Sequence, residues 1–145
     1  MSTGSNLNPY LFFGGRCQEA LDFYRDAVGA KVGMVMRFSD SPDPVPEGML
    51  AQGFEDKIMH SEFEVGGVSV LASDGCNEGD GGFHGFSLAL TTPTEAEAHR
   101  AFDALAVGGK VGMPLQKVFW SPLYGMVTDR FGLQWMVMVP GEPMP

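Results

Sequence analysis

The chain has 145 residues, of which 44% are hydrophobic and 19% are charged, and its formal net charge is −9. This composition is typical of a folded globular protein of about one domain, not of a disordered chain. Binding to a phosphate backbone depends on clustered Lys and Arg, and nine basic residues scattered among 18 acidic ones form no cluster. We therefore expect no nucleic-acid partner.

Targeting and membrane signals are also missing from the sequence. No apolar run approaches the roughly 20 residues of a membrane-spanning helix, and the first five residues lack the basic and apolar regions of a signal peptide. We expect a cytoplasmic protein with no membrane partner. Cys17 and Cys76 have no C-x-x-C spacing, so they predict neither a zinc site nor a redox motif. Cys17 falls on the apolar side of a predicted helix, which favours a buried, unreactive thiol.

The first half of the chain predicts a strand, a helix and three further strands. Apolar side chains at steps of three and four residues from Cys17 to Val28 indicate an amphipathic helix, and Gly29 ends it. Gly66 and Gly67 form a two-residue turn between two alternating runs, as in a hairpin. The expected elements are a strand at 7–13, the helix at 16–28, and strands at 31–38, 57–65 and 68–73.

A long proline-rich loop interrupts this first half. Residues 39–56 contain three prolines with acidic neighbours, which excludes a central strand. Long loops in compact domains often serve function. The loop is therefore either a lid or an ordinary solvated surface loop.

The second half predicts the same order of elements after a glycine-rich, acidic stretch at 74–85. That stretch does not match the spacing of a calcium loop, and we read it as a solvated linker. Thr92 and Glu95 have the spacing of a capping box, with Pro93 at the first helical position. Strands are expected at 86–91, 110–118, 123–129 and 134–139, and Ala98, Ala101, Phe102 and Leu105 supply the buried helix face.

An internal repeat connects the two halves. The segment 27–34, AVGAKVGM, recurs at 106–113 as AVGGKVGM, with seven of eight positions identical. At the same offset of 79 residues, Asn8 falls on Ser87, Leu11 on Leu90 and Phe23 on Phe102. Two copies of this length indicate a duplicated β-α-β-β-β module and not a solenoid. The modules are placed at 7–74 and 85–140 within one domain of residues 1–145, joined by a linker at 75–84.

Four short motifs follow one another along the chain: NPYLFF at 8–13, ALDFY at 20–24, IMHSE at 58–62 and FGLQW at 131–135. In this order they resemble the vicinal oxygen chelate superfamily of glyoxalases, bleomycin resistance proteins and extradiol dioxygenases, and within it the PhnB-like branch. The resemblance covers nearly the whole chain. It implies an α+β fold in which two paired modules form a curved mixed sheet around a cavity, with the helices on the convex face. It also implies a homodimer.

The superfamily's metal-using members place ligands on the first and last strands of each module. The repeat puts these positions at Asn8 and Ser87, and the alignment of Gly67 with Gly132 adds Leu71 and Met136. Family enzymes use His and Glu at such positions, whereas these four side chains offer no carboxylate or imidazole. We therefore expect no bound metal of the usual kind and no cofactor.

Alternation along the strands predicts which side chains face the cavity. If Asn8, Ser87 and Met136 point inward, so do Tyr10 and Gln134, which gives an apolar pocket with a few polar groups. Trp120 and Tyr124 flank Ser121-Pro122 and either stack on a planar ligand or close the core. The candidate ligand-binding residues are Asn8, Tyr10, Ser87, Trp120, Tyr124, Gln134 and Met136.

His60 and Glu62 are the candidate catalytic residues. Two residues apart on one strand, they share a face and are an acid and base pair, or two ligands of an unusual metal site. The alternative is an exposed strand face, because Glu64 continues the row. Two functions follow: a protein that binds a small molecule without the metal quartet, or an isomerase or lyase that uses Glu62 or His60 as proton carrier.

Overall fold

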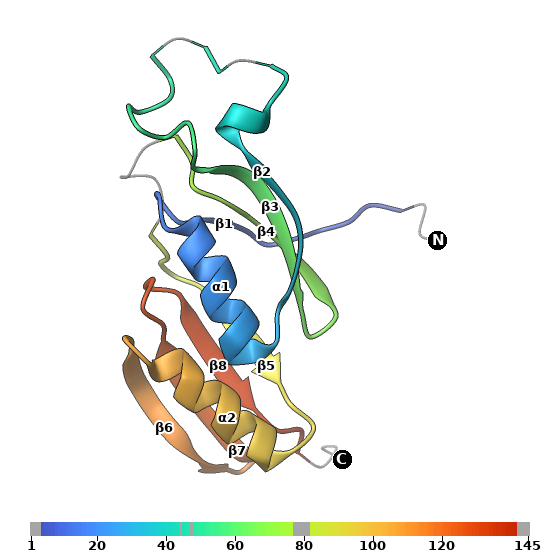
Figure 1. Ribbon diagram of the computed structural model, residues 1–145. Helices are drawn as coiled ribbons and strands as arrows, with labels where there is room; N and C mark the ends of the chain where they lie inside the picture. Colours follow the sequence, from blue (N-terminus) through green and yellow to red (C-terminus); the bar gives the residue numbers. More distant parts are fainter. Residues whose placement is uncertain (1–3, 44, 47, 77–81, 142–145) are drawn as a thin grey trace. The chain divides into compact units, whose positions relative to one another are not determined.

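The computed structural model describes residues 4–43, 45–46, 48–76 and 82–141. Its contacts divide the chain into two compact units, Met1–Arg25 with Ala30–Gly81 and Asp26–Gly29 with Gly82–Pro145. Within the described ranges the chain forms two α-helices, one 3₁₀ turn and two four-stranded mixed sheets, both of them open (Figure 1). The predicted α+β class is confirmed. Residues 77–81 of the expected linker lie outside the described part of the chain, and no helix in that part is long and apolar enough to span a membrane.

The first unit holds a sheet of order β1-β4-β3-β2, in which β1 runs parallel to β4 and the other pairs are antiparallel. Every element predicted for this half is present, and β1 is shorter than expected because only Tyr10–Phe12 pair with β4. The elements are β1 Tyr10–Phe12, α1 Cys17–Val28, β2 Lys31–Arg37, the turn η1 Phe38–Asp40, β3 Ile58–Val65 and β4 Val68–Ser73.

The second unit repeats this topology with the order β5-β8-β7-β6, and β5 runs parallel to β8. Its first strand again begins later than predicted. The elements are β5 Leu88–Thr91, α2 Glu95–Ala106, β6 Lys110–Val118, β7 Ser121–Thr128 and β8 Gln134–Met138.

Helix α1 packs on β3 through its buried side. The Tyr24 ring stacks on Phe63 with centroids 5.6 Å apart, and the Cys17 Sγ lies 3.7 Å from the Ser61 Oγ. Burial raises the pKa of the Cys17 thiol to about 12, partly offset by the Ser61 hydrogen bond. The predicted buried cysteine is therefore confirmed. Gly29 ends the helix with a φ of 69°, which an L side chain rarely adopts.

A buried aspartate fixes the start of helix α1. Asp74 is 1% exposed, and its carboxylate accepts hydrogen bonds from the backbone N–H groups of Gly15, Cys17 and Ile58 at 2.7, 2.8 and 2.9 Å. The expectation that the acidic stretch at 74–85 is solvated is therefore wrong at its first residue. Asp74 belongs to the core, where it satisfies backbone donors that would otherwise be buried without partners.

Helix α2 begins differently from the prediction. Its N-cap is Thr94, whose side chain accepts a hydrogen bond from the Glu97 N–H at 3.2 Å. The expected capping box at Thr92, with Pro93 as the first helical residue, is wrong. Thr92 still belongs to the end of the sheet, since its N–H donates to the Met138 carbonyl and its hydroxyl donates to the Thr94 carbonyl.

The buried face of helix α2 is the predicted one: Ala98, Ala101, Phe102 and Leu105. Phe102 lies against β7 at Gly125, where a Cβ atom would come within 2.9 Å of the phenylalanine ring. The 79-residue offset does not describe helix packing, because Phe102 is buried whereas Phe23 is half-buried.

The two hairpins turn by different means. Gly66 and Gly67 both have positive φ angles, 58° and 82°, as the predicted two-residue turn requires. In the second unit Asp129, which is 3% exposed, holds a longer turn by accepting from the N–H groups of Phe131 and Leu133 and from the indole Nε1–H of Trp135. The sequence motif FGLQW is thus built around a buried carboxylate.

Candidate functional site

The open face of the first sheet exposes aromatic side chains. In β1, Tyr10 and Phe12 are 42% and 43% exposed, whereas Leu11 between them is 2% exposed and points into the core. The Tyr10 and Phe12 rings lie with centroids 5.0 Å apart. Exposed aromatic rings that adjoin one another are a common feature of ligand and partner sites.

Tyr10 also contacts the candidate catalytic histidine. Its hydroxyl oxygen lies 3.2 Å from the His60 Nδ1, and the two ring centroids are 5.8 Å apart. Burial raises the pKa of the Tyr10 phenol, and the influence of the Ser73 side chain offsets part of that rise. Tyr10 therefore remains a neutral hydroxyl at physiological pH, beside a half-buried imidazole.

Glu62 lies on the same face as Tyr10 and His60. The strand register pairs Tyr10 with Leu71 and Leu71 with Glu62, so these three residues form one row across β1, β4 and β3. Glu62 is half-buried, whereas Glu64, two residues further along β3, is exposed. The face thus carries a phenol on β1 and an imidazole and a carboxylate on β3, with β4 between the two strands.

Asn8 lies just before β1 and is exposed. Its side-chain Nδ2 donates to the Ser69 carbonyl at 2.9 Å, which leaves the side-chain oxygen as its group for a ligand. The prediction that Asn8 belongs to the binding residues stays a prediction.

The open face of the second sheet is lined by thioethers. The register pairs Met113 with Met126 and Met126 with Met136, so three methionines form a row across β6, β7 and β8, all of them half-buried. Methionine is flexible and polarizable, which suits it to a surface that adapts to different apolar ligands.

Two polar or aromatic pairs border this methionine row. The Ser87 hydroxyl donates to the Gln134 Oε1 at 2.5 Å. The Trp120 and Tyr124 rings meet edge to face with centroids 4.6 Å apart, and Trp120 is 37% exposed while Tyr124 is 7% exposed. Tyr124 therefore packs into the sheet, and Trp120 is the more accessible ring of the two.

The strand register supports the alignment used for the family's metal positions. Tyr10 and Ala89 are equivalent by the 79-residue offset. Tyr10 pairs with Leu71 in the first sheet and Ala89 pairs with Met136 in the second, so Leu71 and Met136 are equivalent as well. Amide, hydroxyl, alkyl and thioether groups at the four positions do not fit a hard divalent ion. Among the residues that the structure describes, no group of three or more His, Cys, Asp and Glu side chains is placed to hold a metal.

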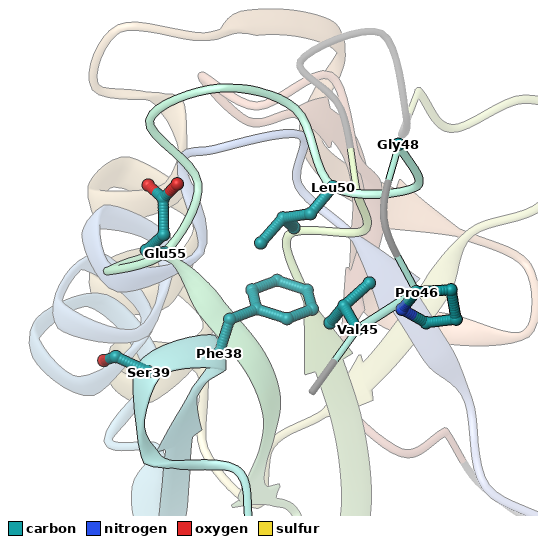
Figure 2. A pocket seen from close by; sticks show the side chains of 7 residues that line it. All are labelled: Phe38, Ser39, Val45, Pro46, Gly48, Leu50 and Glu55. Atoms are coloured by element: carbon teal, nitrogen blue, oxygen red, sulfur yellow. The ribbon is translucent and has the colours of Figure 1, made fainter. Parts of the chain in front are cut away.

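The proline-rich loop contains a pocket of about 360 Å³ that the sequence did not suggest. Figure 2 shows Phe38, Val45 and Leu50 pointing toward one another, with the Glu55 carboxylate at the edge. The base of the loop is held by backbone hydrogen bonds, from Ser39 N–H to the Glu55 carbonyl and from Ala51 N–H to the Cys76 carbonyl. In the sequence, the apolar residues spaced within this polar loop were the signal that could have indicated the pocket.

The lid role of residues 39–56 stays a prediction, and Pro44 lies outside the described residues. The pocket lining is Phe38, Ser39, Val45, Pro46, Gly48, Leu50 and Glu55.

Comparison with known proteins identifies the family. The model of the Glyoxalase/Bleomycin resistance protein/Dioxygenase superfamily matches residues 6–137. The chain belongs to this superfamily. Protein YjdN of Escherichia coli is 35% identical over 140 residues, a match that covers 92% of this chain and 94% of YjdN.

Solved structures support the same assignment. The protein PA1353 from Pseudomonas aeruginosa is 40% identical with a TM-score of 0.81, covering 94% of this chain and 98% of that one. A PhnB protein from Bacillus cereus is 25% identical with a TM-score of 0.75, covering 93% and 99%. The predicted resemblance to the PhnB-like branch is confirmed.

Proposed function

We propose that each sheet of this protein binds a small organic molecule on its own open face, without the metal quartet of its superfamily. Asn8 and Tyr10 contribute from the first sheet, and Ser87, Trp120, Tyr124, Gln134 and Met136 from the second. The observation that carries the proposal is the exposure of Tyr10 and Phe12, each above 40%, beside His60 and Glu62. Apolar surface with a few convergent polar groups is the usual composition of a ligand site.

The proposal is tested by screening a metabolite and fragment library with ligand-observed NMR, then measuring hits against variants. Tyr10→Ala removes a ring from the first open face and Trp120→Ala one from the second, and each should weaken binding to its own face about threefold to tenfold. Phe119→Ala is the matched control, because Phe119 is 87% exposed beside Trp120. Equal affinity in all variants contradicts the proposal.

A second candidate is an isomerase or lyase in which Glu62 or His60 moves a proton. The hydrogen bond between Tyr10 and His60 favours it, because general acids and bases are held in place by such contacts. Glu62→Gln should then abolish turnover of a bound metabolite with little change in its affinity. Glu64→Gln is the control, since Glu64 is an exposed carboxylate on the same strand. Unchanged turnover in Glu62→Gln removes this candidate.

Homodimerisation and a cytoplasmic location complete the proposal, and both rest on family resemblance and sequence composition. Sedimentation velocity at micromolar concentration tests the dimer, with a monomer as the contradicting result.

A further inference from the structure

The contact between Tyr10 and His60 constrains which ring nitrogen carries the proton. The Tyr10 hydroxyl oxygen lies 3.2 Å from His60 Nδ1, within hydrogen-bond distance, and joins residues 50 positions apart in the chain. In a neutral imidazole one nitrogen is a donor and the other an acceptor. If Tyr10 donates to Nδ1, the proton of His60 sits on Nε2, and if Tyr10 accepts from Nδ1, then Nε2 is a bare acceptor.

The chemistry of the two groups favours donation from Tyr10 to His60. A phenol is a better hydrogen-bond donor than acceptor, and an unprotonated imidazole nitrogen is a strong acceptor. At 3.2 Å the Tyr10 hydroxyl is within reach of Nδ1 for this bond.

The groups that face His60 from the neighbouring strands do not compete for its Nδ1. Met36 of β2 pairs with His60 and offers only a thioether, and the Ser73 hydroxyl of β4 donates to the Ile58 carbonyl at 3.3 Å. Along β3 itself, Glu62 is the next residue on the same face. His60 is only half-buried, and its Nδ1 is bound to Tyr10, so Nε2 is the ring nitrogen that a ligand can contact.

We propose that Tyr10 is a positioning residue that holds neutral His60 as the Nε2–H tautomer, so that His60 donates to the ligand and Glu62 is the acceptor. This division of roles rests on the function proposed above. It selects a ligand that presents a hydrogen-bond acceptor to His60 and a hydrogen-bond donor or an acidic proton to Glu62, with a flat part against the Tyr10 and Phe12 rings. It also makes Glu62, and not neutral His60, the base of the second candidate function.

The test is ¹⁵N NMR of the histidine side chains in the full-length, ligand-free protein at pH 8, where histidine is ordinarily neutral. The wild-type protein should show a protonated Nε2 and an unprotonated Nδ1 for His60. Tyr10→Phe removes only the hydroxyl and should lower the tautomer ratio by about twofold to tenfold, moving the two ¹⁵N shifts toward each other. Glu64→Gln, an exposed position on the strand of His60, is the control and should leave them unchanged. His84 and His99 are exposed and serve as internal references.

A protonated Nδ1 in the wild-type protein overturns the proposal, and so does an unchanged tautomer ratio in folded Tyr10→Phe. The wild-type spectrum decides the tautomer even if that variant fails to fold. Because no ligand is used, failure of the small-molecule proposal leaves this measurement intact, and the two ideas fail separately.

Discussion

The two sheets have one topology but carry different chemistry on their open faces. In the first, the row Tyr10, Leu71 and Glu62 crosses β1, β4 and β3, and in the second the equivalent row is Ala89, Met136 and Met126. His60 lies two residues before Glu62 on β3, and Tyr124 holds the equivalent position, two residues before Met126, on β7. Duplication therefore preserved the strand pairing, while the phenol, imidazole and carboxylate lie on the first sheet and the row of thioethers lies on the second.

The two units also hold their helices differently. The N-terminus of α1 is bound by the buried Asp74, whereas α2 is capped by Thr94 within its own first turn. The strands under the two helices differ as well. Ser61 of β3 and Gly125 of β7 are equivalent positions, because Ser61 follows His60 and Gly125 follows Tyr124. Four measurements separate these arrangements.

Asp74→Ala should have the largest effect. It leaves three backbone N–H groups without their acceptor, two of them in buried bonds, and should lower the free energy of unfolding by about 3–5 kcal/mol. Urea denaturation followed by circular dichroism measures this. Asp74→Asn keeps one acceptor oxygen and should cost less. A loss below about 1 kcal/mol for Asp74→Ala would show that water replaces the carboxylate.

Gly125→Ser gives β7 the serine that β3 has at the equivalent position, Ser61. The new Cβ meets the Met113 carbonyl oxygen and the Phe102 ring, both at 2.9 Å, so overpacking should cost about 1–3 kcal/mol. Gly112→Ser is the control on the adjacent strand, because a Cβ there meets nothing closer than 3.6 Å. Equal stability of the two variants would mean that α2 shifts without cost.

The first buried residue of α1 is Cys17, whereas the first buried residue of α2 is Ala98, which does not titrate. The stability of the first unit should therefore depend on pH through a thiol that the second unit lacks at this position. Burial raises the pKa of Cys17 to about 12 in the folded protein, whereas an unfolded cysteine has a pKa of about 8.5. Between these values the unfolded state binds fewer protons. Stability should therefore fall as pH rises, by up to about 1.4 kcal/mol per pH unit.

The measurement for Cys17 is urea denaturation between pH 8 and pH 10, compared with Cys17→Ala. The difference in slope between the two proteins isolates the thiol from other groups that titrate in this range. Parallel pH profiles would contradict the buried, protonated thiol.

Thr94→Ala should have the smallest effect, about 1 kcal/mol, because it removes one local cap from one backbone N–H. Thr94→Ser keeps the hydroxyl and should be close to wild type in the same urea titration. A loss as large as that of Asp74→Ala would show that the two helix starts are energetically alike.

Local patterns predicted the elements, and long-range contacts explain what they missed. Periodicity located both helices and the strands, and glycines marked the ends of α1 and of the first hairpin. Asp74 looked like a linker residue because its partners Gly15 and Cys17 lie 59 and 57 residues earlier. The cap of α2 was misplaced by two residues because Thr92 continues the pairing of the sheet.

The candidate site was predictable in part for the same reason. Alternation placed Tyr10 on an open face and His60 with Glu62, since each inference needs one strand only. The Tyr10 and His60 hydrogen bond and the methionine row depend on strand register, which sequence periodicity does not give.

The position of Asp74 also bears on the order in which the chain folds. Helix α1 gains its N-terminal acceptor only after strand β4 has returned beside it, so its stability depends on closing a loop of 57 residues. Helix α2 takes its N-terminal acceptor from Thr94, within its own first turn. We expect nascent α2 to form early and α1 to become ordered with the β3-β4 hairpin, giving higher φ-values in α2 than in α1.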